Sequence, residues 1–211
     1  MIRSALMATL CTAVFITAPA HAGLISVTGG LSNLGDAAMI ITPPSDVSDD
    51  AATNRAMQGF DEMQGVTLAS DLAVDGGMIS SGMTVSSHML FLNTSGNTRG
   101  IHNDVVWTFD GMVLGVMSDS RGMLEAASSA ILGAAGTFYP GSFGARGFEN
   151  GSNSGDSYSV SGNSITVSMR VTEPGDWIRV VTATPVSEPG ALSLIGLGLF
   201  ALGGMRRRRV S

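Results

Sequence analysis

Hydrophobic and polar residues alternate most regularly between positions 164 and 172. Every second residue from Ile165 to Val171 is apolar, and the residues between them are threonine, serine and arginine. A period of two with one apolar face is typical of an antiparallel strand that buries one side. The pattern therefore predicts a half-buried strand near the end of the chain.

Other β-favourable segments are separated by short turns rich in glycine, asparagine and aspartate. The remaining predicted strands are residues 24–28, 66–72, 83–93, 105–109, 112–117, 158–161 and 177–184. Asp110-Gly111 and Gly162-Asn163 each separate two strands by two residues. Both sites therefore predict a tight hairpin.

Two segments have apolar residues at helical spacing instead. The first begins at Ser48, where a hydroxyl and two carboxylates suit a helix N-terminus, and continues through Phe60 to Gly65. The second is residues 122–132, and the glycine-rich residues 133–155 after it predict an ordered loop. Short strands, glycine-rich turns and one or two short helices predict a mainly β fold, as an antiparallel β-sandwich or jelly-roll-like domain.

The two ends of the chain carry apolar runs that do not belong to this domain. Residues 5–18 are almost all apolar, and Ala20 and Ala22 place small residues where signal peptidase requires them. We therefore expect a secretory signal peptide over residues 1–22 and a mature chain that starts at Gly23. The alternative is an N-terminal membrane anchor, but a membrane span needs about 20 apolar residues.

The second apolar run, residues 191–205, predicts a transmembrane helix. Four arginines follow it directly: Arg206, Arg207, Arg208 and Arg209. Fifteen residues make about 22 Å of helix, which flanking residues and long arginine stems can extend across a bilayer. Arginines beside a membrane span mark its cytoplasmic side, so we expect the domain before the span to lie on the other side of the inner membrane. The alternative, a buried C-terminal helix, does not suit a segment that is apolar on every face.

A short motif of Val186, Ser187, Glu188 and Pro189 precedes this run. The order of a Glu-Pro pair, an apolar helix and an arginine tail resembles the PEP-CTERM sorting signal of Gram-negative bacteria, although Ser187 replaces the first proline. The resemblance implies a transient inner-membrane anchor that the protease exosortase cleaves near the motif. The same region is also catalogued as an ice-binding-protein C-terminal domain, a label that implies no activity.

The expected organisation is a signal peptide over 1–22, a secreted β domain over 23–185 and a sorting signal over 186–211. The β domain carries 16 acidic residues and six arginines, a formal net charge of −10, which excludes nucleic-acid binding. The only cysteine, Cys11, lies in the predicted signal peptide, so the domain has neither a disulfide nor a thiolate metal site. The segments 87–93, 107–111, 113–119, 137–140 and 173–180 also resemble a recurrent domain of exported proteins, which implies export and no particular chemistry.

Histidines are the first candidates for chemistry. His88 and His102, with Asp104 or Asp110, could form a metal or acid–base site. The alternative gives both histidines structural roles, one on a strand face and one in a loop. Since the sequence carries no hydrolase, phosphate-loop or dinucleotide motif, we assign no catalytic residue.

Carboxylates and aromatic residues are the other candidates. The acidic residues that lie close together in sequence are Asp46, Asp49, Asp50, Asp71 and Asp75. Their spacing is not that of a calcium loop, so we assign no metal ligand and no cofactor. The aromatic residues that could stack on sugars are Phe138, Tyr139, Phe143, Phe148 and Tyr158.

These features predict an exported, non-enzymatic protein of the cell surface or extracellular matrix, structural or adhesive in biofilm or exopolysaccharide. Signal peptidase and exosortase are the expected processing enzymes, and exopolysaccharide is a candidate partner. The alternatives are a carbohydrate-binding module, a secreted hydrolase, or a periplasmic protein that keeps its membrane anchor.

Overall fold

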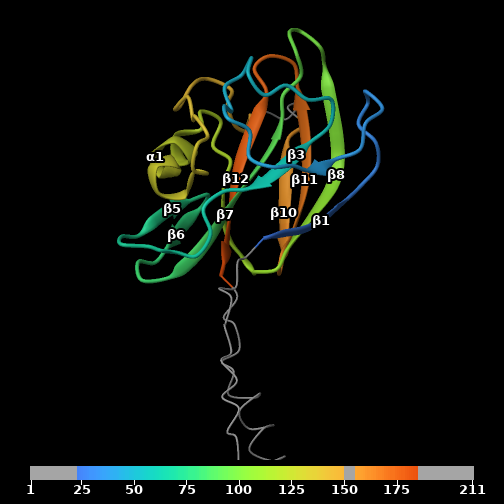
Figure 1. Ribbon diagram of the computed structural model, residues 1–211. Helices are drawn as coiled ribbons and strands as arrows, with labels where there is room; N and C mark the ends of the chain where they lie inside the picture. The colour runs from blue at the N-terminus through green and yellow to red at the C-terminus, as the bar shows by residue number, and fades with distance from the viewer. Residues whose placement is uncertain (1–22, 150–154, 185–211) are drawn as a thin grey trace, which may run out of the picture. The chain divides into compact units, whose positions relative to one another are not determined.

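A computed structural model describes residues 23–149 and 155–184 (Figure 1). Within these ranges the strands form a four-stranded sheet, a six-stranded sheet and a two-stranded ribbon, with one helix after the ninth strand. The mainly β fold predicted by the alternation of residues is confirmed.

The four-stranded sheet is antiparallel throughout, in the order β1-β8-β11-β10. Its strands are β1 (Leu24–Thr28), β8 (Gly100–Phe109), β10 (Ser157–Ser161) and β11 (Ser164–Val171). The hairpin predicted at Gly162-Asn163 joins β10 to β11. Burial alternates along β11 as predicted, with Ile165 to Val171 buried at every second position.

The six-stranded sheet has the order β2-β3-β7-β12-β9, and β4 pairs with β7 beside β3. Its strands are β2 (Met39–Ile40), β3 (Gln58–Asp61), β4 (Val66–Thr67), β7 (Thr84–Leu92), β9 (Val113–Met117) and β12 (Asp176–Ala183). The short β2–β3 pair is parallel, and the other pairs are antiparallel. The strand predicted over 66–72 is instead divided between β4 and the ribbon of β5 (Leu72–Val74) and β6 (Gly77–Ile79).

The largest hydrophobic core lies between the two main sheets. Leu90 of β7 and Ile178 of β12 meet Trp107 of β8 and Val167 of β11 in one buried cluster. Each such side chain contributes about 1.5–3 kcal/mol by leaving water. This core holds the two sheets face to face.

The opposite face of the six-stranded sheet is covered as well. The helix α1 (Met123–Leu132), the β5–β6 ribbon and the loop after α1 lie on the side of β7 and β12 away from the four-stranded sheet (Figure 1). For this reason β7 and β12 are buried along nearly their whole length. The predicted helix over 122–132 is confirmed as α1.

The helix predicted over residues 48–65 is wrong. Residues 48–52 form turns and bends, and Phe60 lies in β3, which pairs with β7. Gly59 explains the difference, because a Cβ there would come within 2.7 Å of Leu90 and Trp107. The bare backbone of β3 packs directly on the core, and this tertiary contact outweighs the local helical pattern.

The hairpin predicted at Asp110-Gly111 is also wrong. β8 and β9, on either side of this turn, belong to different sheets. A Cβ on Gly111 would overlap the carbonyl oxygen of Ala183, so the turn passes tightly against the end of β12. The turn therefore carries the chain from one sheet to the other.

No helix among the described residues is long and apolar enough to span a membrane. The predicted signal peptide (1–22) and transmembrane helix (191–205) lie outside the described residues.

Candidate functional site

Most of the residues predicted to direct export lie outside the described part of the chain. They are Ala20, Ala22, Val186, Ser187, Glu188, Pro189, Arg206, Arg207, Arg208 and Arg209. Gly23 is described, and its carbonyl oxygen accepts a hydrogen bond of 3.2 Å from the backbone N–H of Asp110. Ala183 donates to the carbonyl of Met112 in the same turn. The two ends of the described domain therefore lie beside one turn.

His88 lies in a buried hydrogen-bond chain between the sheets. Its Nδ1 is 2.7 Å from Oδ1 of Asp61, and its Nε2 is 3.0 Å from the hydroxyl of Thr182. Burial alone would raise the pKa of Asp61, but the hydrogen bonds from His88 and from the Leu24 backbone N–H outweigh burial and lower it. His88 and Thr182 are fully buried, so this chain connects β3, β7 and β12 and reaches the surface only at the partly exposed Asp61.

His102 has different partners. Its Nδ1 accepts a hydrogen bond from the Met57 backbone N–H at 3.1 Å, and its Nε2 lies 3.0 Å from the carbonyl oxygen of Gly30. The structure therefore does not join His88 and His102 in one site, and neither makes a hydrogen bond with Asp104 or Asp110.

The aromatic residues considered for sugar stacking do not share one exposed surface. Phe148 and Tyr158 pack on each other, and Phe143 packs on the buried Trp177. The Tyr139 hydroxyl donates to Glu62 at 2.7 Å and accepts from the Ala134 backbone N–H. Only Phe138 of this group is largely exposed. These side chains mainly attach the loop after α1 to the domain.

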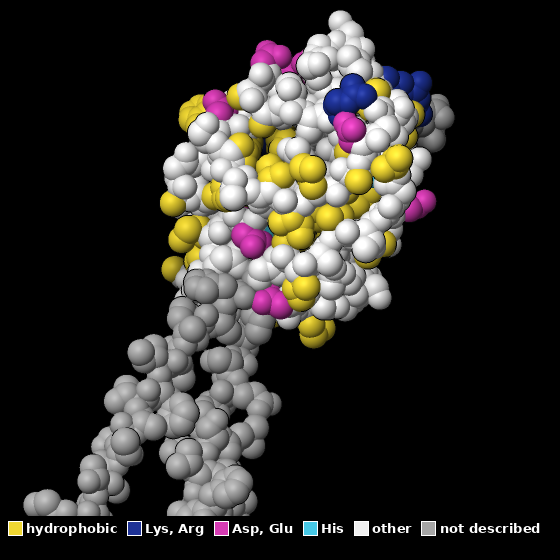
Figure 2. Space-filling view, turned by 45° about the vertical axis from the view of Figure 1, so that its right-hand side comes forward, with side chains coloured by type: hydrophobic (Ala, Val, Ile, Leu, Met, Phe, Trp, Pro, Cys, Tyr) yellow, Lys and Arg dark blue, Asp and Glu magenta, His cyan; other side chains and the backbone are white. Residues whose placement is uncertain are grey.

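The described surface carries shallow depressions beside β2 and near α1. One depression of about 340 Å³ is lined by Asp36, Thr53, Asn54, Arg55 and Ser95, and it contains the exposed Arg55–Asp36 ion pair. Figure 2 shows hydrophobic side chains gathered over part of the surface on the side of β1 and β8. Exposed apolar residues of β1, β2 and the connection between them include Ile25, Leu31, Met39 and Ile40.

Three of the carboxylates considered for calcium have structural partners. Asp46 accepts a hydrogen bond from the Ser48 backbone N–H, and Asp71 accepts one from that of Ser81. Asp75 accepts from both the backbone and the hydroxyl of Ser118, and the Tyr158 hydroxyl donates to it. Burial and the negative charge of Asp75 raise the pKa of Tyr158 to about 12.

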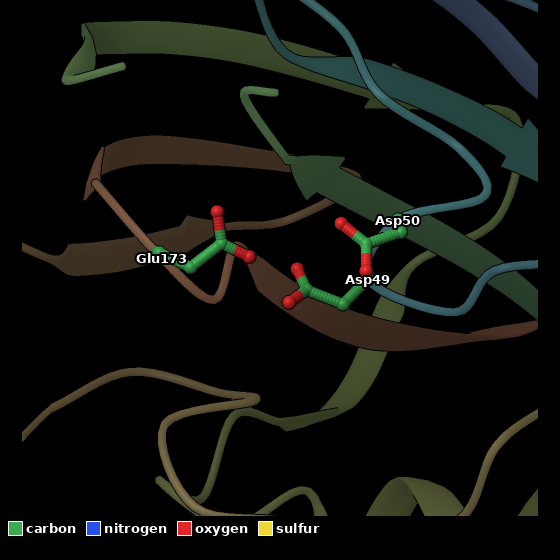
Figure 3. A group of neighbouring side chains, drawn as sticks. All are labelled: Asp49, Asp50 and Glu173. Carbon is green, nitrogen blue, oxygen red and sulfur yellow. The ribbon is translucent and has the colours of Figure 1, made fainter. Parts of the chain in front are cut away.

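The other two, Asp49 and Asp50, meet Glu173 at the surface (Figure 3). One carboxylate oxygen from each of these residues lies within 4.8 Å of the others. Glu173 belongs to the connection between β11 and β12, and Oδ1 of Asp49 accepts a hydrogen bond from the Gly175 backbone N–H. A hydrogen bond with Asp49 and the charges of Asp49 and Asp50 raise the pKa of Glu173. Asp50 and Glu173 are exposed, so water solvates this first acidic cluster.

A second acidic cluster consists of Glu149, Asp156 and Asp176. Glu149 lies in the loop after α1, Asp156 precedes β10, and Asp176 begins β12. One carboxylate oxygen from each lies within 4.8 Å of the others. Unlike the first cluster, this one extends into the interior, because Asp176 is only 1% exposed.

The electrostatics of the second cluster are unfavourable for three negative charges. Burial, together with the charges of Asp156 and Glu149, raises the pKa of Asp176 to about 10. Burial also raises the pKa of Glu149 and of Asp156, although the Arg170 backbone N–H, 2.8 Å from Oδ1 of Asp156, acts in the opposite direction. The arrangement can hold a proton or bind a hard cation through oxygen ligands.

Sequence reasoning did not select Glu149, Asp156 and Asp176. They are separated in the chain by gaps of 7 and 20 positions, and only the folding of β10 and β12 brings them together. The one local signal is Asp176 itself, an acidic residue directly before the apolar strand that starts at Trp177.

Comparisons with known protein families, curated proteins and solved structures found no match for this chain.

Proposed function

We propose that the chain is an exported protein of the cell surface or extracellular matrix, with a structural or adhesive role in biofilm or exopolysaccharide. One observation carries the proposal: Glu188-Pro189, the apolar run 191–205 and the four arginines after it stand in the order of a PEP-CTERM sorting signal. In this proposal signal peptidase cleaves before Gly23, and an exosortase cleaves near Glu188.

The boundaries of the fold support this organisation. All strands of the described residues lie between Leu24 and Ala183, so the proposed signals at residues 1–22 and 186–211 supply none of them. Removing both segments would therefore leave every described strand and its pairing partners in place. A domain that is cleaved at both ends has to keep its fold after processing.

The arrangement of sheets supports a structural role. We propose that the two packed sheets are a β-sandwich of the kind common in surface proteins, with its interior filled by the cluster around Trp107 and Leu90. The histidines take part in holding this interior together, so the proposal gives them no catalytic role. Exopolysaccharide remains the proposed partner, and the geometry favours no second function.

The position of the two domain ends supports surface attachment. Gly23 and Ala183 both bond to the turn at residues 110–112, whereas Asp176 begins β12 at its other end. Eight residues of strand span about 25 Å. The end of the domain that carries both acidic clusters therefore lies opposite to the end at which residue 184 leaves β12.

The experiment is to measure the intact mass of the protein in the surface fraction of its native host. We expect the mass of a chain that begins at Gly23 and ends near Ser187–Pro189. The variant Glu188→Ala, Pro189→Ala should keep the C-terminal arginines and stay in the inner membrane. Ser187→Pro is the matched control, and it should be processed at least as completely as the unaltered chain.

Retention of Arg206–Arg209 by the unaltered chain, with the protein in the inner membrane, would overturn the sorting proposal. The chain would then be a permanently anchored periplasmic protein, and the role in the matrix would have to be abandoned.

A further inference from the structure

Three carboxylates from distant parts of the chain meet at the start of β12. Glu149 comes from the loop after α1, Asp156 from the residue before β10, and Asp176 from the first position of β12. One oxygen from each lies within 4.8 Å of the others, a separation at which one ion can contact all three. The backbone N–H of Arg170 donates to Oδ1 of Asp156 at 2.8 Å and orients that carboxylate.

A second observation distinguishes this cluster from an ordinary acidic surface. Asp176 is 99% buried, and its Oδ2 is a buried oxygen that accepts no hydrogen bond. A buried carboxylate oxygen without a donor is costly, and in folded proteins buried charges are paired or coordinate metals. The oxygen belongs to a residue whose carboxylate lies close to the two others, so a cation bound among the three carboxylates would supply the missing partner.

We propose that Glu149, Asp156 and Asp176 bind a calcium ion. Three carboxylates offer six oxygens, and calcium takes six to eight oxygen ligands at flexible geometry. Zinc and copper prefer nitrogen and sulfur ligands, which this site lacks because His88 and His102 are engaged elsewhere. Magnesium requires a regular octahedron and keeps several waters, which a site with one buried wall accommodates less well.

The first acidic cluster does not meet the same conditions. Asp50 and Glu173 are exposed, and Oδ1 of Asp49 already accepts a hydrogen bond from the Gly175 backbone N–H. Figure 3 shows Asp49 and Asp50 on one loop beside Glu173 on the β11–β12 connection. This cluster therefore carries no proposal, but it provides a control of matched charge close in sequence to Asp176.

Calcium at the second cluster would join both main sheets. Asp156 leads into β10 of the four-stranded sheet, and Asp176 leads into β12 of the six-stranded sheet. The unfolded chain does not bring these residues together, so the ion binds the native state and stabilises it. An exported domain without disulfides gains a cross-link that depends on extracellular calcium.

The test uses the full-length chain in a non-ionic detergent, first treated with EDTA and then supplied with calcium chloride or magnesium chloride. The readout is the unfolding temperature Tm, followed by the fluorescence of Trp107 and Trp177. Extracellular calcium modules bind with a Kd of about 0.1–1 mM, and calcium tenfold above Kd should raise Tm by about 3–6 °C. Calorimetric titration should give one ion per chain.

Variants assign the effect to the cluster. Asp176→Asn and Glu149→Gln should each remove most of the calcium-induced rise, while Asp50→Asn in the first cluster should retain it. In EDTA, Asp176→Asn should be at least as stable as the unaltered chain, because it removes one of three carboxylates that repel one another. Glu149 is exposed, so Glu149→Gln keeps the test decisive if Asp176→Asn does not fold.

Three results would overturn the proposal: no rise with calcium, an equal rise with magnesium, or a rise that depends on Asp50 but not on Glu149. A fourth is a loss of stability in Asp176→Asn that is as large in EDTA as in calcium, since it would identify a purely structural carboxylate. Proteolytic processing is read from a mass, so failure here is distinct from failure of the proposed function.

Discussion

The guanidinium of Arg179 and the carboxylate of Glu62 form two parallel hydrogen bonds of 2.7 Å, and both side chains are completely buried. Glu62 also accepts from the hydroxyls of Ser87 and Tyr139, while Arg179 donates to Ser128 of α1. The pair thus connects β12 to the helix that covers its outer face. Because its remaining hydrogen-bonding positions are used, the pair can exist without water.

The replacement Arg179→Met should be among the most destabilising single changes in the domain. It leaves the Glu62 carboxylate buried without its cation, which costs about 3–5 kcal/mol in the free energy of unfolding. The matched control is Arg55→Met, because the Arg55–Asp36 pair is exposed. Breaking that pair should cost about 0–1 kcal/mol. Urea unfolding of the full-length chain measures both.

Equal costs for Arg179→Met and Arg55→Met would contradict this account of the buried pair. The double replacement Arg179→Met, Glu62→Met should be less damaging than the sum of its parts, because no unpaired charge then remains.

The hydroxyl of Tyr139 should have a measurable effect of its own. Tyr139→Phe removes the donor to Glu62 and the acceptor for the Ala134 backbone N–H, so one buried donor and one buried acceptor each lose a partner. We expect a loss of about 1–3 kcal/mol in urea unfolding. Tyr158→Phe removes a single, longer hydrogen bond of 3.1 Å to Asp75 and serves as the comparison. A larger loss in Tyr158→Phe would argue against the importance of the hydrogen bonds among Tyr139, Glu62 and Arg179.

The turn that transfers the chain between sheets should not tolerate a side chain. In Gly111→Ala the new Cβ meets the carbonyl oxygen of Ala183, and backbone atoms cannot move aside as a flexible side chain can. We expect a loss of about 3 kcal/mol, seen as a lower unfolding midpoint in urea. Gly144→Ala is the control, since its Cβ meets nothing within 4 Å, and it should change stability by less than about 1 kcal/mol. Similar midpoints for the two variants would show that the turn can relax.

Asp61 should contribute to the dependence of stability on pH. Its pKa is lower in the folded state, so its contribution is complete above the ordinary aspartate pKa of about 3.9 and is lost as the pH falls through the folded value. Since the side chain is 40% exposed, the contribution should be about 1 kcal/mol or less. Urea unfolding at several acidic pH values should show a smaller loss on acidification in Asp61→Asn than in the unaltered chain. Parallel curves would contradict the assignment.

The fold could be predicted where local pattern and tertiary environment agree. The strand β11 buries one face only, so its alternation is visible in the sequence, and α1 shows its apolar positions at helical spacing. The prediction failed over residues 48–65, because Gly59 lies against Leu90 and Trp107 and its neighbours form a strand. A contact with residues distant in the chain cannot be read from spacing.

The candidate sites divide in the same way. A sorting signal depends on the order of adjacent residues, so it can be predicted from sequence alone. The second acidic cluster depends on how β10 and β12 are placed, and the burial that distinguishes Asp176 from Glu173 arises only on folding. Likewise, strand pairing places His88 within hydrogen-bond distance of Asp61 and Thr182. Asp104 and Asp110, which lie closer to His88 in the sequence than Asp61 does, are not its partners.

The central position of β12 has a mechanical consequence. This strand ends at Ala183, directly before the segment that is proposed to hold the protein, and it pairs with β7 along its whole length and with β9 over part of it. A pull on the chain at residue 184 along the strand loads these ladders in shear, so their hydrogen bonds share the force and must break together. Current or abrasion acting on the proposed tethered domain would therefore be resisted by a strand that has seven of its eight residues buried.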